Sequence, residues 1–294
     1  MSKVLSTYLT GGLGNQLFKS IGTLHLASML SRSSELNLSW YQYVHQFELT
    51  ITPRQFELDY FPNIISSFSK LELSSSPKLD LRKNQLMRKS PKSFRNRMGY
   101  YTDEEINEID DKQTKVKLLA NFESVNYLPD NPRLQYLLEP KTSMSSWQQS
   151  QLENIGSEEY IGIHVRMGDY LKFPNIYNIL TSEYYCEALS NSKYRDKLPV
   201  VLFSDEPDKA QKWLGKSVKV TYSVDVDPSL NSAECMLLLS NSKTIITAHS
   251  TFSWWAARIG WLQNVTQEVM IPKRFFANSE SNSSNFLVSG WKQC

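Results

Sequence analysis

The pattern of hydrophobic and polar positions divides the chain into two α/β halves. In the first half, residues 3–9 alternate and are rich in β-forming types, and a glycine-rich turn follows at residues 11–14. Residues 17–30 then carry apolar side chains at helical spacing. Strand, glycine turn and helix in this order are typical of the opening of a Rossmann-like domain. Residues 63–115 lack strong periodicity and predict loops with short helices, whereas residues 116–120 predict a second strand.

The second half alternates strands and helices more regularly. Strands are predicted over residues 160–165, 199–204, 218–222, 243–247 and 269–271. Helices are predicted between them, over residues 183–192, 207–214, 233–240 and 252–261. This spacing is that of βαβ units and predicts a parallel, Rossmann-like sheet. Three prolines between residues 129 and 140, followed by a Gln- and Ser-rich helical stretch, indicate a boundary near residue 150, which gives domains 1–150 and 151–294.

Composition and charge narrow the class of protein. A chain of 294 residues fits two domains of ordinary size, and 40% hydrophobic with 21% charged residues is a globular composition. The net charge of +2 argues against a nucleic-acid partner, because such proteins usually carry a marked basic excess. Segment 82–97 is locally basic, with seven Lys and Arg residues. A solvated helix face is the favoured interpretation of it, and contact with an anionic acceptor or a membrane surface is the alternative.

The cysteines and the N-terminus bear on location. Cys186, Cys235 and Cys294 are too few and too widely spaced for a disulfide framework or a zinc site, so a reducing compartment is expected. The first ten residues resemble neither a signal peptide nor an anchor, and no run of about 18 apolar residues occurs. We therefore expect a cytoplasmic protein with at most peripheral contact at the inner face of the membrane.

A first polar cluster follows the first predicted strand. The turn Gly11-Gly12-Leu13-Gly14-Asn15-Gln16 lets backbone approach a ligand and offers the N–H groups of a helix start to an anion. It matches neither GxGxxG nor a P-loop, so a nucleotide cofactor is disfavoured. A plain tight turn remains the alternative, although the two amide side chains favour ligand contact.

A second cluster ends the strand predicted over residues 160–165. It delivers His164, Arg166 and Asp169 within six residues, and alternation places the first two on one face. Ligands of open α/β sheets bind at the carboxyl ends of strands, and arginine suits bidentate phosphate binding. The alternative is a structural ion pair between Arg166 and Asp169.

A third cluster lies between the strand at 243–247 and the next helix. Ser250 and Thr251 stand where hydroxyl groups cap a helix, and the same geometry also cradles a phosphate. Trp254 and Trp255 are expected to pack the helix on the sheet. The Asp225-Val226-Asp227 motif could hold a metal in principle, but without other acids or histidines near it an ordinary loop is favoured. We expect no metal and no cofactor.

Taken together, four motifs resemble those of the bacterial α-1,2-fucosyltransferases, which form glycosyltransferase family 11. They are GGLGNQLF at 11–18, HVRMGDY at 164–170, LFSDE at 202–206 and SNSKTIITAHSTFSWWAARIGW at 240–261. The resemblance implies a GT-B fold, with two facing Rossmann-like domains and a central cleft. It also implies GDP-fucose as donor on the second domain, an oligosaccharide or lipid-linked glycan acceptor on the first, and inverting transfer to a galactoside O2 without a metal.

The resemblance carries roles onto individual residues. It implies that Arg166 holds the β-phosphate and stabilises the leaving GDP, with Asp169 as a second catalytic residue. His164 would lie near the nucleotide, Asn15 at the sugar and diphosphate, and Asp205 at the base pocket. The remaining donor-site residues, of which the last three would line the nucleotide and phosphate pocket, are Gly12, Gly14, Gln16, Glu234, Ser250, Thr251 and Phe252.

Several points stay open at this stage. The general base is Asp169, an acid of the first domain, or His25. Three positions depart from the family pattern: Met167 replaces a second arginine, His249 replaces an asparagine, and Cys235 replaces an acid whose part the neighbouring Glu234 can take. Alternatives to fucose transfer are another GDP-sugar and a non-catalytic glycan-binding module. The intact charged cluster disfavours the latter.

Overall fold

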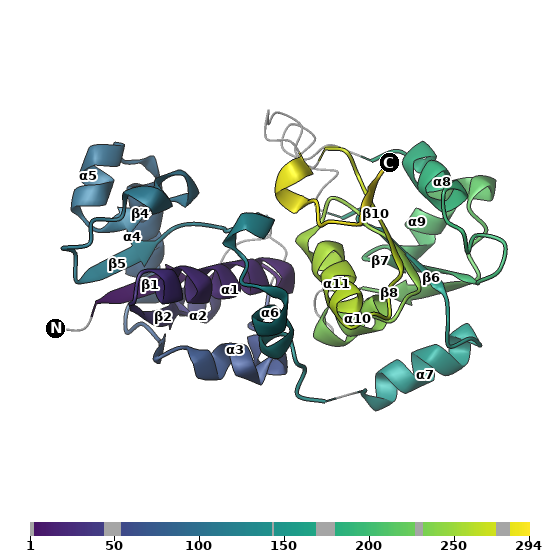
Figure 1. Ribbon diagram of the computed structural model, residues 1–294, viewed down its shortest axis with the longest axis horizontal. Helices are drawn as coiled ribbons and strands as arrows, with labels where there is room; N and C mark the ends of the chain where they lie inside the picture. Colours follow the sequence, from purple (N-terminus) through teal and green to yellow (C-terminus); the bar gives the residue numbers. More distant parts are fainter. Residues whose placement is uncertain (1–2, 44–53, 143, 169–179, 227–231, 275–282) are drawn as a thin grey trace. The chain divides into compact units, whose positions relative to one another are not determined.

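The computed structural model divides into two compact units, Met1–Lys141 and Thr142–Cys294 (Figure 1). The boundary expected near residue 150 would fall inside helix α7 (Ser146–Ile155), which belongs to the second unit. The residues that the structure describes are 3–43, 54–142, 144–168, 180–226, 232–274 and 283–294.

Unit 1 contains a five-stranded parallel sheet in the order β3-β2-β1-β5-β4. The chain runs from β1 outward to β2 and β3 and then crosses to the other side of β1, so the switch point lies between β1 and β5. The strands are β1 Val4–Tyr8, β2 Ser33–Asn37, β3 Lys70–Glu72, β4 Tyr100–Tyr101 and β5 Lys115–Leu118.

The helices of unit 1 pack on this sheet mainly through α1. Its residues Leu17, Phe18 and Ile21 are fully buried, and a Cβ added to Gly22 would lie 2.5 Å from the ring of Phe122, so the helix approaches the segment after β5 very closely. The helices are α1 Leu13–Met29, α2 Ser39–Tyr43, α3 Pro62–Ser67, α4 Pro77–Lys89, α5 Lys92–Arg97 and α6 Asn131–Leu137, with 3-10 turns η2 Leu58–Tyr60, η3 Asp103–Glu108 and η4 Val125–Tyr127.

Strands β2, β3 and β4 were not expected from the sequence. The sequence of β2 is Ser-Ser-Glu-Leu-Asn, in which only Leu36 is hydrophobic. The strand forms because it pairs in register with β1, where Leu5 faces Ser34, and because small hydroxyl side chains tolerate burial beside α1. Pairing with β1 therefore made this segment a strand. The pattern of hydrophobic residues along the segment could not predict this pairing.

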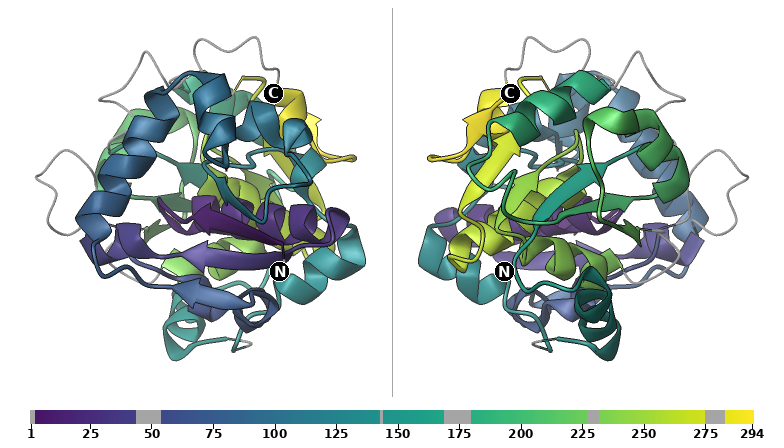
Figure 2. Two further views of the ribbon diagram at one scale, coloured as in Figure 1. Left: turned by 90° about the vertical axis from the view of Figure 1, so that its left-hand side faces the viewer. Right: turned by 90° about the vertical axis from the view of Figure 1, so that its right-hand side faces the viewer.

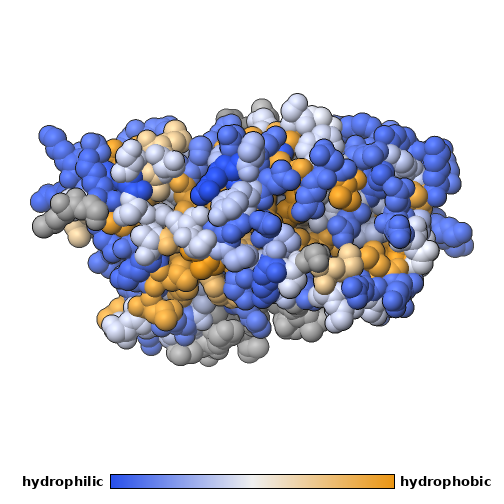
Figure 3. Space-filling model, turned by 60° about the horizontal axis from the view of Figure 1, so that its bottom comes forward, coloured by the Kyte–Doolittle hydropathy of each residue, from blue (hydrophilic) through white to orange (hydrophobic). Residues whose placement is uncertain are grey.

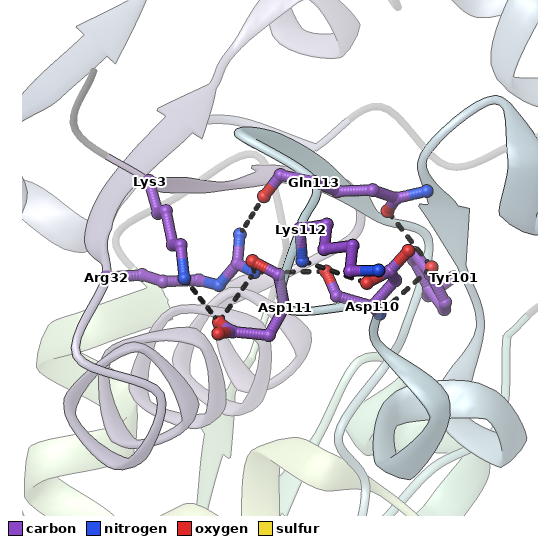
Figure 4. Close-up of polar contacts among 7 residues, drawn as sticks. All are labelled: Lys3, Arg32, Tyr101, Asp110, Asp111, Lys112 and Gln113. Atoms are coloured by element: carbon purple, nitrogen blue, oxygen red, sulfur yellow. Dashed lines mark hydrogen bonds and ion pairs between the residues drawn. The ribbon is translucent and has the colours of Figure 1, made fainter.

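Arg32, which precedes β2, binds the loop that leads into β5. Its Nη1 donates to the carbonyl oxygen of Gln113 at 2.7 Å, and its Nη2 donates to those of Asp110 and Asp111 at 3.2 and 3.4 Å (Figure 4). Lys3 pairs with the carboxylate of Asp111 at 2.7 Å. These contacts hold the loop before β5 against the start of β1, far along the strands from their carboxyl ends.

Unit 2 contains a six-stranded parallel sheet in the order β11-β10-β9-β6-β7-β8. The parallel sheet expected for this half is confirmed. The strand expected over residues 218–222 lies four residues later, because Val218 packs in the core before the chain enters β8. The strands are β6 Ile161–Val165, β7 Val200–Ser204, β8 Tyr222–Asp225, β9 Thr244–Ile246, β10 Glu268–Ile271 and β11 Lys292–Gln293.

Helix α11 is buried deeply against this sheet. Trp254 and Trp255 are fully buried, and the indole Nε1 of Trp254 donates to the carbonyl oxygen of Phe286 at 2.7 Å, so their expected packing role is confirmed. The other helical elements of unit 2 are α8 Ser182–Ser190, α9 Pro207–Leu214, α10 Ser232–Ser240, η6 Gly215–Ser217 and η7 Ser283–Phe286, and α11 spans Thr251–Leu262.

Candidate active site

The topology of unit 2 marks one place for a ligand. The chain runs from β6 to β7 and β8 on one side and then crosses to β9 on the other side of β6. Open α/β sheets bind ligands where the strand order reverses, outside the carboxyl ends. In unit 2 that place lies after β6 and β9, where the second and third polar clusters of the sequence meet.

Arg166 leaves the end of β6 and pairs with Asp205, which follows β7. The Nη1 atom of Arg166 lies 2.9 Å from Oδ2 of Asp205, and the two side chains are only 11% and 7% exposed. The other carboxylate oxygen of Asp205 accepts the backbone N–H of Met167 at 2.9 Å. Asp169, the partner of Arg166 in the alternative ion pair, lies outside the described residues. Asp205 therefore contacts the arginine and its loop, and the place at the base pocket that the resemblance implies for it stays a prediction.

Gly168 allows this contact to form. A Cβ at this position would lie 2.3 Å from Oδ2 of Asp205, far inside van der Waals distance. The glycine of the HVRMGDY motif is therefore needed so that the carboxylate can reach under the loop and hold both Arg166 and the backbone of Met167.

His164 is buried as a neutral ring beside this pair. It is 2% exposed, its ring centroid lies 5.2 Å from that of Phe252, and burial together with the charge of Arg166 lowers its pKa to about 3. Its Nδ1 has no hydrogen-bond partner among the described residues. A neutral imidazole can donate or accept one hydrogen bond at a ligand, but it cannot supply positive charge there.

The third cluster forms the start of α11 at the carboxyl end of β9. The hydroxyl oxygen of Ser250 accepts the backbone N–H of Phe252 at 3.3 Å, so its capping role is confirmed. Thr251 and Phe252 are partly exposed in the first turn. The helix start places partial positive charge beside the switch point, which is favourable for an anion.

Glu234, which the resemblance implies at the donor site, and its neighbour Cys235 both lie on helix α10. Glu234 lies on α10 and is half-buried, and its carbonyl oxygen accepts Nε2 of Gln148 at 3.2 Å. Cys235 is buried, with its thiol 3.7 Å from the carbonyl oxygen of Asp225. Asp227 lies outside the described residues. Across the described part of the chain, no three His, Cys, Asp or Glu side chains gather as metal ligands.

The first cluster opens α1 in unit 1, and its residues differ in role. Gly11 adopts a φ of +89°, which favours glycine, and Gly12 is the N-cap. Gly14 is buried and Asn15 half-buried. Gln16 is fully buried: its amide nitrogen donates to the carbonyl oxygens of Gly11 and Gln55, and its amide oxygen accepts the N–H of Glu57. The polar atoms of its side chain thus hydrogen-bond to backbone groups, and ligand contact by Gln16 stays a prediction.

Two charged residues at the switch point of unit 1 were missed by the sequence reasoning. Lys19 of α1 is 2% exposed, and its Nζ lies 2.8 Å from the hydroxyl oxygen of Thr10, just after β1. Burial, assisted by the charge of Arg88, lowers the pKa of Lys19 to about 8. Burial raises the pKa of Glu123, which follows β5, to about 7, although Lys19 opposes the shift.

The loop that carries Glu123 is fixed by hydrogen bonds to the carboxylate of Asp103. The carboxylate of Asp103 accepts the backbone N–H of Asn121 at 2.9 Å and of Phe122 at 2.7 Å. Phe122 has a φ of +58°, so the chain turns sharply before Glu123. A lysine within the apolar helix pattern and an acid soon after a strand were the available sequence signals. His25, the other candidate base, lines a cavity with Ser33 and Ser34 at the amino end of β2, the opposite edge of the sheet.

The motif pattern and this geometry agree with a family assignment. The model of glycosyl transferase family 11 matches residues 100–292, well over half of the chain. The chain belongs to this family. The resemblance inferred from the four motifs is confirmed. As a member of family 11, this protein is a glycosyltransferase.

Two curated relatives are from Escherichia coli. An alpha-1,2-colitosyltransferase is 26% identical over 304 aligned positions, which cover 96% of each chain. The O-antigen biosynthesis glycosyltransferase WbnK is 28% identical over 134 residues, 44% of this chain and 42% of its own.

Solved structures of fucosyltransferase NodZ from Bradyrhizobium share the fold of this transferase. One aligns with a TM-score of 0.51 and 13% identity over 87% of this chain and 93% of that chain. NodZ co-crystallised with GDP aligns with a TM-score of 0.53 and 14% identity. The expected GT-B class, with two parallel-sheet α/β domains, is confirmed. None of the described helices is long and apolar enough to cross a membrane.

Proposed function

We propose that this transferase moves L-fucose from GDP-fucose to a glycan acceptor with inversion at the anomeric carbon, with O2 of a galactoside as the accepting hydroxyl. The buried Arg166–Asp205 pair at the switch point of unit 2 is the observation that carries the proposal. The family assignment, the α-1,2-linkage in the name of one relative and the GDP bound to NodZ support it.

The leaving group explains the need for Arg166. The acceptor oxygen bonds to the anomeric carbon while the bond from that carbon to the β-phosphate oxygen breaks, and the electron pair stays on GDP. We assign Arg166 to the developing charge, with Asp205 orienting its guanidinium. The start of α11, capped by Ser250, adds partial positive charge. Neutral His164 then serves as a hydrogen-bond partner of the nucleotide.

The acceptor hydroxyl must also lose a proton. We assign this step to Glu123, because a carboxylate whose pKa lies near neutrality can accept a proton and release it to water at working pH. Lys19 stabilises the ionised carboxylate. In this proposal unit 1 binds the acceptor and unit 2 binds the donor. Asn15 of unit 1 contacts the sugar of the donor. Asp169 remains the second candidate for the base.

GDP-colitose is a second candidate donor, because the colitosyltransferase relative matches over nearly the whole chain. Colitose lacks the 3-hydroxyl of fucose. A site that hydrogen-bonds this hydroxyl rejects the deoxy sugar by about 10⁴, whereas an apolar site rejects the extra hydroxyl by only about 10². The ratio of kcat/KM for the two donors therefore decides the matter. A ratio favouring GDP-colitose would overturn the fucose assignment.

Three further measurements test the proposal. Calorimetry with GDP, UDP, ADP and CMP should show GDP binding tightest, and equal binding of UDP would contradict a GDP-sugar donor. Turnover in EDTA should equal turnover with Mg²⁺, and restoration by metal would contradict the metal-free mechanism. Slow hydrolysis of GDP-fucose without acceptor should occur, since a non-catalytic glycan-binding module would show none.

A further inference from the structure

Most of the large hydrophobic side chains that are exposed in the described part of the chain lie in one short stretch. On the face drawn in Figure 3, hydrophobic residues reach the surface in patches bordered by hydrophilic ones. Six of the ten large hydrophobic side chains that are exposed lie between residues 71 and 98. They are Leu71, Leu73, Leu79, Leu86, Phe94 and Met98, and their exposed fractions run from 39% to 67%.

The same stretch concentrates positive charge. Residues 77–98 contain eight Lys and Arg residues and a single acid, Asp80, although the whole chain carries only +2. The rest of the chain is therefore net negative. This asymmetry belongs to α4 and α5, which lie on the outside of unit 1, coloured blue in the left view of Figure 2.

One side of helix α4 packs against unit 1, and the opposite side is exposed to solvent. Leu81 and Met87 are buried, and Nη2 of Arg88 donates to the carbonyl oxygen of Leu119 at 2.6 Å. Leu79 and Leu86, both 62% exposed, are seven residues apart and so share the opposite side. Leucine in such positions is not needed for packing within unit 1.

Helix α5 is fixed by a buried arginine and presents other residues outward. Arg95 forms an ion pair with the buried Glu105 and donates to the carbonyl oxygen of Ser90 at 2.9 Å. Phe94 and Met98, four residues apart, are about half exposed. A buried ion pair of Arg95 therefore fixes the helix in place, while Phe94 and the C-cap residue Met98 remain exposed.

Several cations here have no structural task. Within the described residues, Lys78, Arg82, Lys89 and Arg97 have no ion-pair partner, and all four are exposed. We call a set of nine exposed residues from these two helices and the C-cap of α5 the α4–α5 surface: Lys78, Leu79, Arg82, Lys83, Leu86, Lys89, Phe94, Arg97 and Met98. This surface mixes unpaired cations with exposed Leu and Phe. Such a composition is typical of protein surfaces that contact anionic lipid headgroups and the boundary of the acyl chains at the same time.

We infer that the α4–α5 surface binds the surface of an anionic lipid bilayer. The cations attract acidic headgroups, and the Leu, Phe and Met side chains enter the boundary between headgroups and chains. A soluble polyanion would bind the cations but leave the Leu, Phe and Met side chains in water. The exposed apolar side chains therefore favour a membrane as the partner. The inference does not depend on the donor or acceptor of the transferase, because it concerns binding alone.

Co-sedimentation of the full chain with vesicles tests it. Vesicles of phosphatidylcholine with about one third phosphatidylglycerol should bind the protein at least tenfold more tightly than phosphatidylcholine alone, because each basic side chain contributes about fivefold. Added salt should weaken the binding. Equal binding to both vesicles, or preference for a soluble RNA over the vesicles, would overturn the inference.

Matched variants locate the surface. Arg82→Glu with Lys89→Glu should lower vesicle binding by at least tenfold. Lys216→Glu with Lys219→Glu makes the same change of net charge on exposed lysines of unit 2 and should leave binding within about twofold. Leu79→Ser with Leu86→Ser should weaken binding even at low salt. All variants should melt as the wild type does. Equal losses in the two charge-reversal pairs would contradict a local surface.

Discussion

The switch points of the two sheets carry different kinds of charge. After β6 and β7 of unit 2, Arg166 and Asp205 form a buried pair, and an arginine keeps its charge at any working pH. After β1 and β5 of unit 1, burial brings the pKa of Lys19 to about 8 and of Glu123 to about 7. The same topology thus holds a permanent cation in one unit and titratable groups in the other.

This difference matches the two needs of glycosyl transfer. A departing nucleoside diphosphate needs positive charge that does not vary, whereas an attacking hydroxyl needs a group that can take up a proton. Burial alone does not decide which result follows. In unit 2 a close opposite charge accompanies burial, whereas in unit 1 the charges are desolvated more than they are paired.

The largest expected effect comes from Arg166→Ala. Turnover should fall on the order of 10²–10³, because the developing charge loses its main partner. The melting temperature should fall too, since Asp205 is left buried and uncompensated at a cost of about 3 kcal/mol.

The double variant Arg166→Ala with Asp205→Asn separates the two effects. Removing the orphaned charge should restore much of the melting temperature and none of the turnover. Arg166→Lys keeps the charge but not the planar fork, and should lose on the order of tenfold or more. Recovery of turnover together with stability in the double variant would show that the pair is only structural.

The titratable edge predicts a pH effect. With Glu123 as base, kcat should rise as pH increases through about 7, because the ionised carboxylate is the active form. Glu123→Gln should lower kcat on the order of 10² and remove this rise. Glu104→Gln, at an exposed acid of η3, is the control and should change neither. An unchanged pH profile in Glu123→Gln would transfer the role to Asp169.

The same carboxyl should affect stability with a defined sign. Its pKa is raised from 4.5 to about 7, so the folded protein holds the proton more tightly than the unfolded chain does. The wild type should therefore lose stability as pH rises from about 4.5 to about 7, and Glu123→Gln should lose less over that window. Urea unfolding at several pH values measures the difference.

Gly168→Ala should have a smaller effect. The new methyl would meet Oδ2 of Asp205, so the loop and Arg166 must shift by a fraction of an ångström or more. We expect turnover to fall about tenfold with the charge pair still present, because positioning and not charge is changed. Gly215→Ala, where no atom lies within 4 Å of the added Cβ, controls for a general effect of replacing glycine, although its φ of +64° itself costs some stability.

The smallest expected effect compares two helix caps. Ser250→Ala and Ser145→Ala each remove an N-cap hydroxyl, of α11 and α7 respectively, and each should cost about 1 kcal/mol of unfolding free energy. GDP affinity, measured by calorimetry, should weaken only in Ser250→Ala. Equal GDP affinity in the two variants would remove the start of α11 from the donor site.

Much of unit 2 could be read from the sequence because its strands are buried on both faces. Such strands appear as nearly continuous apolar runs, as in Ile161–Val165, where only His164 is polar, and Val200–Ser204, where only Ser204 is polar. In unit 1 the strand Ser33–Asn37 and the short strands after it carry polar or mixed residues, so their pairing had no local signal. The basic helices α4 and α5 likewise lacked a clear apolar periodicity.

The sequence by itself determined the family, the order of elements in unit 2 and the residue types of the polar clusters, because motifs and burial patterns are local properties of the chain. Only the tertiary structure decided their partners. It joined Arg166 to Asp205, 39 positions away, committed Gln16 to backbone and buried Lys19. The physical reason is that desolvation and ion pairing depend on which strands become neighbours, and the strand order of a sheet is set by the packing of the whole unit.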